Sequence, residues 1–241
     1  MADLFSAYPL KSVQLRNRIV MSPLCQYSAV DAVPNDWQLV KLGSRTAGAV
    51  GGVLAEATAV SPEGRITVGD TRLWSDAQAE SVARIARFVE SQGAVPGIRL
   101  AHAGRKASAL RPWEGQGQYA ATDPKGWEIL GPSAEAFGGP LTRVPAAMTL
   151  ADIARVRDDF VAAARRALAA GFRWLVLHYA HGYLAQSFLS PLANHRSDAY
   201  GGDVEGRARF LLKTFAAVRA VWPEHLPRAV RLGVIDYVDG E

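Results

Sequence analysis

The strongest constraint on the fold of this chain is the alternation of apolar, strand-length segments with amphipathic, helix-length segments. Strands are predicted at 18–25, 51–60, 94–102, 173–178 and 228–236, and helices at 36–48, 75–93, 149–171 and 207–222. Strands that are apolar on both faces need cover on both sides, and connecting helices supply it. The pattern therefore predicts an α/β fold with a parallel sheet, which is either a doubly wound sheet or a (β/α)₈ barrel.

Boundary residues support two of the helices. Ser75 is in the N-cap position before one helix, and Gly93 ends it. Thr149 opens another helix with Asp152 in the capping-box position, and Gly171 ends it. Small hydroxyl residues at the start and glycine just past the end are the residue types that helix termini favour.

Polar residues at the ends of the predicted strands favour the barrel. They follow or end the first four strands, at Cys25, Glu56 to Thr58, His102 and His178. A barrel places its chemistry at the carboxyl ends of its strands, whereas no G-x-G-x-x-G motif of a dinucleotide-binding sheet follows the first strand.

The number of elements is smaller than a barrel needs. We predict five strands and four helices, and a (β/α)₈ barrel has eight of each. We expect residues 1–241 to form the N-terminal part of a single barrel domain, with an insertion at about 103–148 and a loop at 179–206. The alternative is an open sheet with two exposed edges, which invite pairing with another chain.

Composition narrows the class of protein. The net charge of +4 at pH 7 comes from basic residues that are spread along the chain, so we expect no nucleic-acid partner, although an anionic cofactor suits it. Cys25 is the only cysteine, which excludes an internal disulfide and favours a reducing compartment. No signal-peptide pattern opens the chain, and no run approaches ~20 apolar residues. We expect a cytoplasmic protein with no membrane partner.

The stretch LHYAHGYL at 177–184 is the richest in chemistry. Three interpretations are open for His178, His181 and Tyr183. They could contribute to a metal site, although their spacing differs from H-E-x-x-H. They could satisfy buried backbone groups. Alternatively, the two imidazoles donate hydrogen bonds to one substrate oxygen while the phenol, with an ordinary pKa of ~10, donates a proton.

Other strand-end residues carry weaker signals. Cys25 is either a small buried residue or, with Tyr27, part of an active-site face. Arg231 lies in an apolar strand and needs either an ion-pair partner or an anion. The stretch HAGRKAS at 102–108 is either an anion site or a hydrogen-bonded turn.

Together these motifs resemble the Old Yellow Enzyme family of FMN-dependent ene-reductases, and in particular its bacterial branch of xenobiotic reductase A and similar NADPH dehydrogenases. The matching stretches run in order along the chain, as NRIVMSPLCQY, EATAVSPEGRIT, GIRLAHAGRKAS, RPWEG, LHYAHGYLAQSFLSPLANHRSDAYGG and RARFLL. The family fold is a (β/α)₈ barrel with FMN at the carboxyl ends of the strands.

The resemblance implies a role for each matching residue. The flavin would be contacted by Ser22, Pro23, Leu24, Cys25, Ala57, Arg99, His178 and Arg231. Tyr27 would lie over the substrate, His178 and His181 would hold its carbonyl or nitro oxygen, and Tyr183 would be the proton donor. The implied reaction uses NADPH or NADH to reduce FMN and then reduces small electrophilic alkenes. No metal ion is implied, and a homo-oligomer is left open.

Three departures from the family pattern bear on this expectation. Arg99 stands where the family usually has a glutamine, so it either raises the flavin potential or crowds the flavin ring. Gln38 and Lys41 replace common histidines, and Gly206 replaces a common asparagine. The last three barrel strands, where the family binds the FMN phosphate, lie outside the 241 residues. Two alternatives therefore stay open, a metal-dependent barrel hydrolase and a non-catalytic truncated remnant.

Overall fold

The computed structural model describes residues 3–30 and 34–236, and they contain a parallel sheet. Five strands lie side by side in the order β10–β9–β6–β4–β3, and a short β5 pairs with the end of β4. Their bounds are β3 Val20–Met21, β4 Gly52–Ala59, β5 Thr71–Arg72, β6 Val95–Ala101, β9 Trp174–Tyr179 and β10 Arg228–Leu232. Every pair in this sheet is parallel, as predicted.

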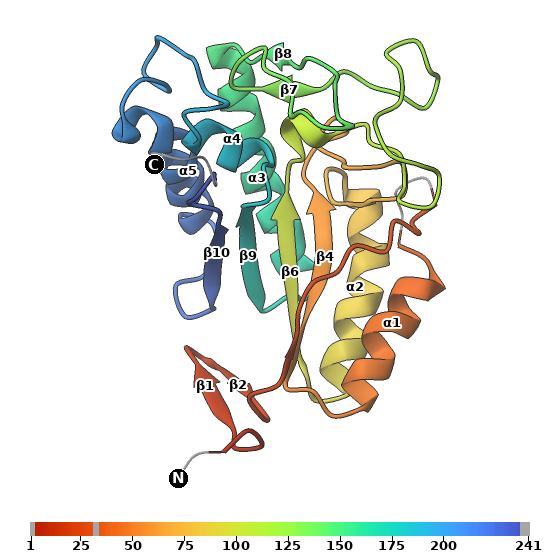
Figure 1. Ribbon diagram of the computed structural model, residues 1–241. Coiled ribbons are helices and arrows are strands. Elements are labelled where there is room, and N and C mark those ends of the chain that lie inside the picture. Colours follow the sequence, from red (N-terminus) through yellow and green to blue (C-terminus); the bar gives the residue numbers. More distant parts are fainter. Residues whose placement is uncertain (1–2, 31–33, 237–241) are drawn as a thin grey trace.

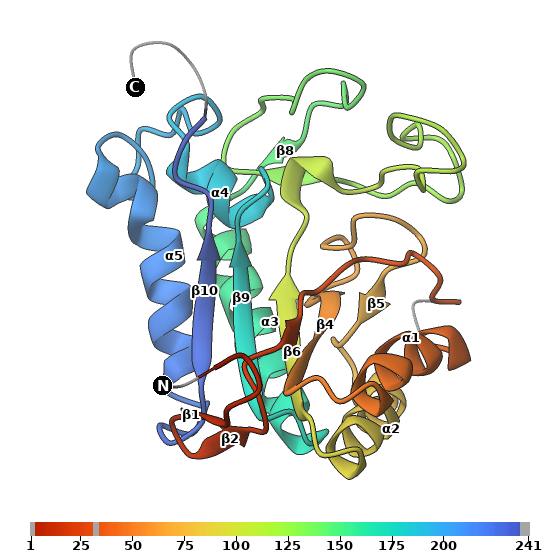
Figure 2. The same ribbon diagram turned by 60° about the horizontal axis from the view of Figure 1, so that its bottom comes forward.

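Four helices connect the main strands and cover one face of the sheet (Figure 1). They are α1 Asp36–Ala47, α2 Asp76–Ser91, α3 Leu150–Ala169 and α5 Val204–Arg219. Figure 2 shows the strands curling with the helices on the outer side, while β3 and β10 are the outermost strands of the sheet. This is the arrangement of a partial (β/α)₈ barrel, so the predicted fold class is confirmed.

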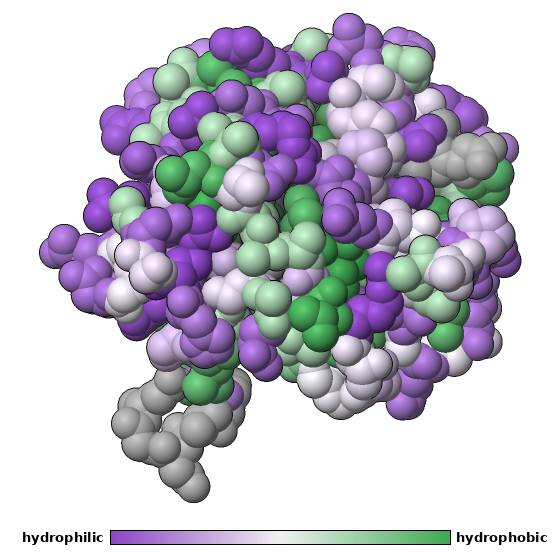
Figure 3. Space-filling model, turned by 90° about the horizontal axis from the view of Figure 1, so that it is seen from above, coloured by the Kyte–Doolittle hydropathy of each residue, from purple (hydrophilic) through white to green (hydrophobic). Residues whose placement is uncertain are grey.

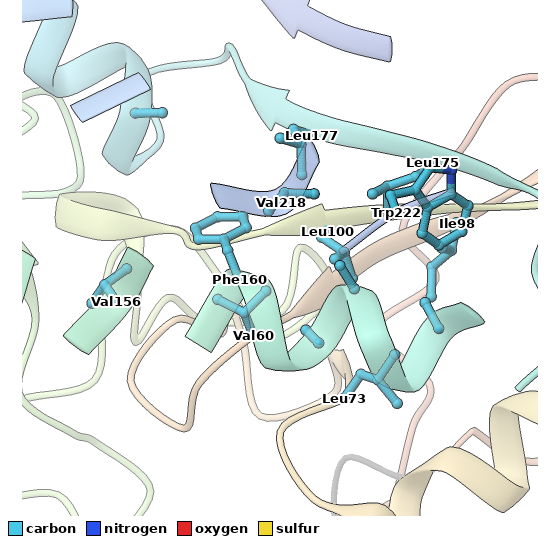
Figure 4. Packing of buried hydrophobic residues seen from close by; sticks show 14 of the residues in the cluster. Val60, Leu73, Ile98, Leu100, Val156, Phe160, Leu175, Leu177, Val218 and Trp222 are labelled. Atoms are coloured by element: carbon cyan, nitrogen blue, oxygen red, sulfur yellow. The ribbon is translucent and has the colours of Figure 1, made fainter. Parts of the chain in front are cut away.

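The largest apolar cluster lies between the sheet and the helices (Figure 4). Ile98 and Leu100 of β6 and Leu175 and Leu177 of β9 are almost fully buried there. They pack with Phe160 of α3 and with other apolar residues of α3 and α5. Burial of one such side chain stabilises the fold by about 1.5–3 kcal/mol. Because side chains alternate along a strand, Arg99, Val176 and His178 point to the opposite, concave face.

The boundary residues predicted for two helices are confirmed, since Ser75 and Thr149 are the N-caps of α2 and α3, and Gly93 and Gly171 lie just past their ends with positive φ. The side chain of Thr149 accepts a hydrogen bond from the Asp152 N–H at 3.1 Å, and Ser75 forms a capping box with Gln78. Phe88 of α2 is apolar but 37% exposed. Its ring lies over Gly43 of α1, where an added Cβ would be 2.7 Å from the ring. Phe88 therefore packs between two helices rather than against the sheet.

Several elements differ from the prediction. An N-terminal hairpin of β1 Tyr8–Leu10 and β2 Val13–Leu15 was not predicted. The first barrel strand is only Val20–Met21, because Pro23 has no N–H to donate. The predicted 179–206 loop contains the six-residue α4 Leu184–Leu189, which is too short to show a helical period. Helix α5 begins at Val204 because the Asp203 side chain caps it by accepting from the Gly206 N–H at 2.8 Å.

The chain between β6 and α3 forms the expected long excursion above the strand ends (Figure 1). It starts with the 3₁₀ turn η1 Gly104–Lys106 and contains the short parallel pair of β7 Leu130–Gly131 and β8 Ala146–Ala147. Arg196 ties this excursion to the 190–202 segment, because its guanidinium donates to the carbonyls of Pro132 and Met148 and pairs with Asp198. In residues 3–30 and 34–236 no helix has the length and apolar character to cross a membrane.

Candidate active site

The strand register brings the predicted site residues onto one concave face. Ala57 of β4 pairs in register with Arg99 of β6, and Arg99 pairs with Val176 of β9. One row closer to the strand ends, His178 of β9 pairs with Arg231 of β10. Residues in register on parallel strands share a face, so these side chains converge at the carboxyl ends of the strands.

His178, His181 and Tyr183 form one aromatic cluster. The His178 ring centroid lies 4.8 Å from that of His181 and 5.1 Å from that of Tyr183, and all three pairs meet edge to face. A tight turn makes this possible, since His181 has φ +62° and Gly182 has φ +70°. The left-handed conformation is unfavourable for histidine, so the turn holds His181 at a backbone cost of about 1–2 kcal/mol.

His178 is a buried, neutral imidazole without a partner inside the described chain. Its side chain is 1% exposed, and neither ring nitrogen has a hydrogen-bond partner among the described residues. Burial, together with the positive charge of Arg99, lowers its pKa to about 2. A neutral ring keeps one N–H donor, and an unpartnered buried donor points to a ligand that completes it.

Tyr183 is held in its protonated form. It is buried at the start of α4, and burial raises its pKa well above the ordinary value. A phenol that stays protonated at neutral pH has the form that a proton donor requires.

The loop after β3 brings Cys25 and Tyr27 to the same place. Both pack in a small cluster with Ala57 and Tyr183. Burial raises the pKa of the Cys25 thiol to about 11, so it is a neutral thiol at pH 7. Tyr27 has φ +52°, and Gly69 permits this conformation because an added Cβ would lie 2.0 Å from the Tyr27 carbonyl oxygen.

The other predicted residues of this loop lie less deeply. Ser22 is exposed, Pro23 is half-buried, and Leu24 is 63% exposed. Their backbone follows β3, so they border the concave face and are not packed inside it. Ser22, Pro23 and Leu24 thus lie outside the cluster that Cys25 and Tyr27 form with Ala57 and Tyr183.

Arg231 is exposed on the edge strand β10 rather than buried in a structural ion pair. Within residues 3–30 and 34–236, no carboxylate lies within 4.0 Å of its guanidinium. Its register position beside His178 leaves the guanidinium facing the strand-end region, where it can bind an anion.

The HAGRKAS stretch forms a hydrogen-bonded turn. The His102 Nδ1 atom accepts from the Gly104 N–H at 3.1 Å, Arg105 donates to the Ala136 carbonyl at 3.0 Å, and Lys106 donates to the His181 carbonyl at 3.0 Å. The turn therefore supports the histidine turn from the neighbouring strand. An open cleft of about 580 Å³ lies beside it, between Phe137, Arg105, His181 and Arg231.

Figure 3 shows this face from above. Apolar residues, in green, run through its middle between hydrophilic rims in purple.

Glu56 was noted in the sequence as a polar strand-end residue but was given no role. A β-bulge in β4 falls at this residue, since the register with β6 shifts between Ala55 and Ala57. The buried carboxylate accepts from the Gln26 N–H at 2.7 Å and from the Thr71 hydroxyl at 2.8 Å. Glu56 therefore fixes the loop that carries Cys25 and Tyr27. A charged residue in the apolar run GGVLAEATAV was the signal for it.

The departures at α1 and α5 have structural roles. Lys41 and Gln38 are buried, and they bond to the 24–28 loop through the Leu24 carbonyl and the Ser28 hydroxyl. Gly206 is required in α5, because an added Cβ would lie 2.0 Å from the Gly201 carbonyl oxygen. In residues 3–30 and 34–236 no three His, Cys, Asp or Glu side chains lie close enough to share a metal ion.

Comparison with known proteins identifies the family of the chain. Residues 3–241 match the model of the NADH:flavin oxidoreductase / NADH oxidase family. The chain is 43% identical over 237 residues to the NADH:flavin oxidoreductase FG08077 of Gibberella zeae, covering 98% of this chain and 57% of that protein. It is also 43% identical to an NADPH dehydrogenase of Bacillus velezensis, covering 98% of this chain and 65% of that protein.

Solved structures give the same result. Morphinone reductase superposes with a TM-score of 0.84 at 31% identity, over 96% of this chain and 62% of that one. Old Yellow Enzyme from Pichia sp. AKU4542 superposes with a TM-score of 0.82 at 30% identity, over 96% and 59%. The chain thus spans about 57–65% of the length of these relatives. It belongs to the NADH:flavin oxidoreductase / NADH oxidase family, and the resemblance of its motifs to Old Yellow Enzyme is confirmed.

Proposed function

We propose that the protein is an FMN-dependent NAD(P)H oxidoreductase that reduces the activated C=C bond of α,β-unsaturated carbonyl or nitro compounds. The observation that carries the proposal is the buried His178 ring, whose nitrogens have no partner among the described residues, beside His181 and Tyr183. Such a cluster suits a substrate oxygen on which negative charge develops.

The residues present fit FMN. Arg99 and His178 are buried polar side chains with unpartnered nitrogens on the concave face, and a cofactor with carbonyl and ring-nitrogen acceptors would satisfy them. The residues proposed to hold it are Ser22, Pro23, Leu24, Cys25, Ala57, Arg99, His178 and Arg231. When bound, FMN supplies the two-electron transfer between the nicotinamide reductant and the substrate.

The chain supplies orientation and proton placement. His178 and His181 each donate one N–H to the substrate carbonyl or nitro oxygen. Each preorganised donor to a developing oxyanion is worth about 3 kcal/mol of barrier. Tyr183, kept protonated by burial, gives a proton to the α-carbon. Tyr27 packs beside Cys25 and covers the substrate.

The experiment separates the two half-reactions of the purified protein. Replacing His178 and His181 together by Ala is expected to lower reduction of 2-cyclohexenone by about 10³-fold or more, since two oxyanion donors are lost. Flavin reduction by NADPH should change far less. His195→Ala is the matched control, because His195 is an exposed histidine outside the cluster.

Three outcomes would contradict the proposal. An equal loss of rate in both half-reactions would show that the two histidines do not act on the substrate oxygen. A colourless protein that takes up no FMN would refute the oxidoreductase and favour a non-catalytic remnant. Stoichiometric zinc in place of flavin would favour the metal-dependent hydrolase.

A further inference from the structure

Arg99 is a buried cation without a counter-ion among the described residues. It lies in the middle of β6, its side chain is 4% exposed, and its Nε and Nη1 atoms have no hydrogen-bond partner there. None of the ion pairs found in residues 3–30 and 34–236 includes it. Burying an unpaired charge costs several kcal/mol, so a native protein keeps one where a ligand completes it.

The groups around Arg99 do not neutralise it. The Cys25 thiol, which is close enough to share a hydrogen bond with Arg99, stays protonated at pH 7. His178 is neutral, and Arg231 in the next row adds a second positive charge. All four face the concave side of the sheet, so this part of the site carries net positive charge.

The two buried carboxylates of the described residues, Glu56 and Asp70, have other partners. Glu56 accepts from the Gln26 N–H and the Thr71 hydroxyl. Asp70 accepts from the Ile66 and Thr67 N–H groups at 2.6 Å and 3.0 Å. Both hold loops in place, and neither pairs with Arg99.

We propose that Arg99 tunes the redox potential, making the bound flavin easier to reduce by pairing with the negative charge that the cofactor gains on reduction. This rests on the proposed function, because it requires FMN on the concave face. In the reduction step, NAD(P)H would transfer one hydride to FMN, which gives the anionic reduced flavin and NAD(P)⁺ without consuming a further proton. The product carries one more negative charge than oxidised FMN, and a desolvated guanidinium stabilises that charge strongly.

The experiment measures the midpoint potential of FMN in the purified protein by titration against redox dyes. In the Arg99→Gln protein, the affinity for reduced FMN relative to that for oxidised FMN is expected to be about 100-fold lower than in the wild type. This ratio corresponds to a potential lower by ~60 mV for a two-electron couple. Arg99→Lys keeps the charge and should retain most of the wild-type potential.

Arg65→Gln is the matched control. It removes a guanidinium that lies 4.1 Å over the Trp127 ring, and it should leave the potential unchanged. A lowered potential in R99Q, with R99K and R65Q near wild type, would support the proposal.

Two results would overturn the inference and leave the proposed function standing. One is an unchanged potential in R99Q while every variant binds flavin. The other is a protein that binds FMN only after Arg99→Gln, because Arg99 would then occupy the space of the ring. If none of the variants takes up FMN, the proposed function and the inference both fail.

Discussion

Glu56 offers a direct test of how the site is assembled. The carboxylate is 6% exposed, and it links the 22–28 loop to β4 and β5 through Gln26 and Thr71. In Glu56→Ala the Gln26 N–H loses its acceptor in a buried place, the Thr71 hydroxyl loses its partner, and a small cavity is left. An unsatisfied buried donor costs about 1–3 kcal/mol and a lost hydrogen bond about 1 kcal/mol. We therefore expect the free energy of unfolding of E56A to be lower than that of the wild type by about 3 kcal/mol.

Glu56→Gln separates shape from charge. The glutamine oxygen can accept from the Gln26 N–H, and its NH₂ group can donate to the Thr71 oxygen, which accepts as well as donates. Burial raises the pKa of the Glu56 carboxyl, so the native carboxylate already has a desolvation cost that glutamine avoids. We expect E56Q to lose about 1 kcal/mol or less.

Urea unfolding at pH 7 measures both variants, with Thr71→Val as the matched control for the loss of one hydrogen bond. The 3 kcal/mol expected for E56A corresponds to a Tm lower by ~6–12 °C for a chain of this size. FMN affinity should fall in E56A and stay near wild type in E56Q. If E56A is no less stable than T71V, Glu56 does not hold the loop, and the reasoning is refuted.

Two further predictions concern the histidine turn. The pKa of His178 is about 2 in the fold and 6.5 in the reference state, so the folded protein binds fewer protons between these values. Its stability is fully present above pH 6.5 and declines as the pH falls. Between pH 8 and pH 5 we expect the free energy of unfolding to fall by about 2 kcal/mol in the wild-type protein and to stay nearly constant in His178→Asn, as measured by urea unfolding at both pH values. The same fall in both proteins would contradict the argument from burial. Gly182→Ala should cost at least ~2 kcal/mol, because φ is +70° and the added Cβ would lie 2.4 Å from the Phe137 ring. Thermal unfolding measures this, with Phe137→Ala expected to recover part of the loss; an unchanged Tm would show that the turn relaxes freely.

The sequence was most informative where a regular pattern decided the structure. The strand of Ile98 and Leu100 and the helix of Val156 and Phe160 are buried as their periodicity requires. The convergence of His178 with Arg231 also follows from the pattern, because strand ends of a parallel sheet meet at one edge. Caps such as Thr149 were predictable, since their chemistry is local.

The features that the sequence did not predict depend on contacts between distant parts of the chain. The bulge at Glu56 re-aims that side chain away from the concave face, and no period shows such a shift in register. The exposure of Arg231 depends on β10 being an outermost strand. Gly182 and Phe137 are far apart in sequence and meet only because the excursion after β6 folds over the strand ends.

The turn that carries His181 is supported from a different strand than its own. Lys106 bonds to the His181 carbonyl, and Phe137 from the excursion packs on Gly182. The proposed donors His178 and His181 thus belong to β9 and to the turn after it, while Arg105 and Phe137 in the lining of the adjoining cleft belong to the excursion. A change at Phe137 therefore alters the lining of the cleft and the support of the His181 turn at the same time, so the two cannot vary independently there.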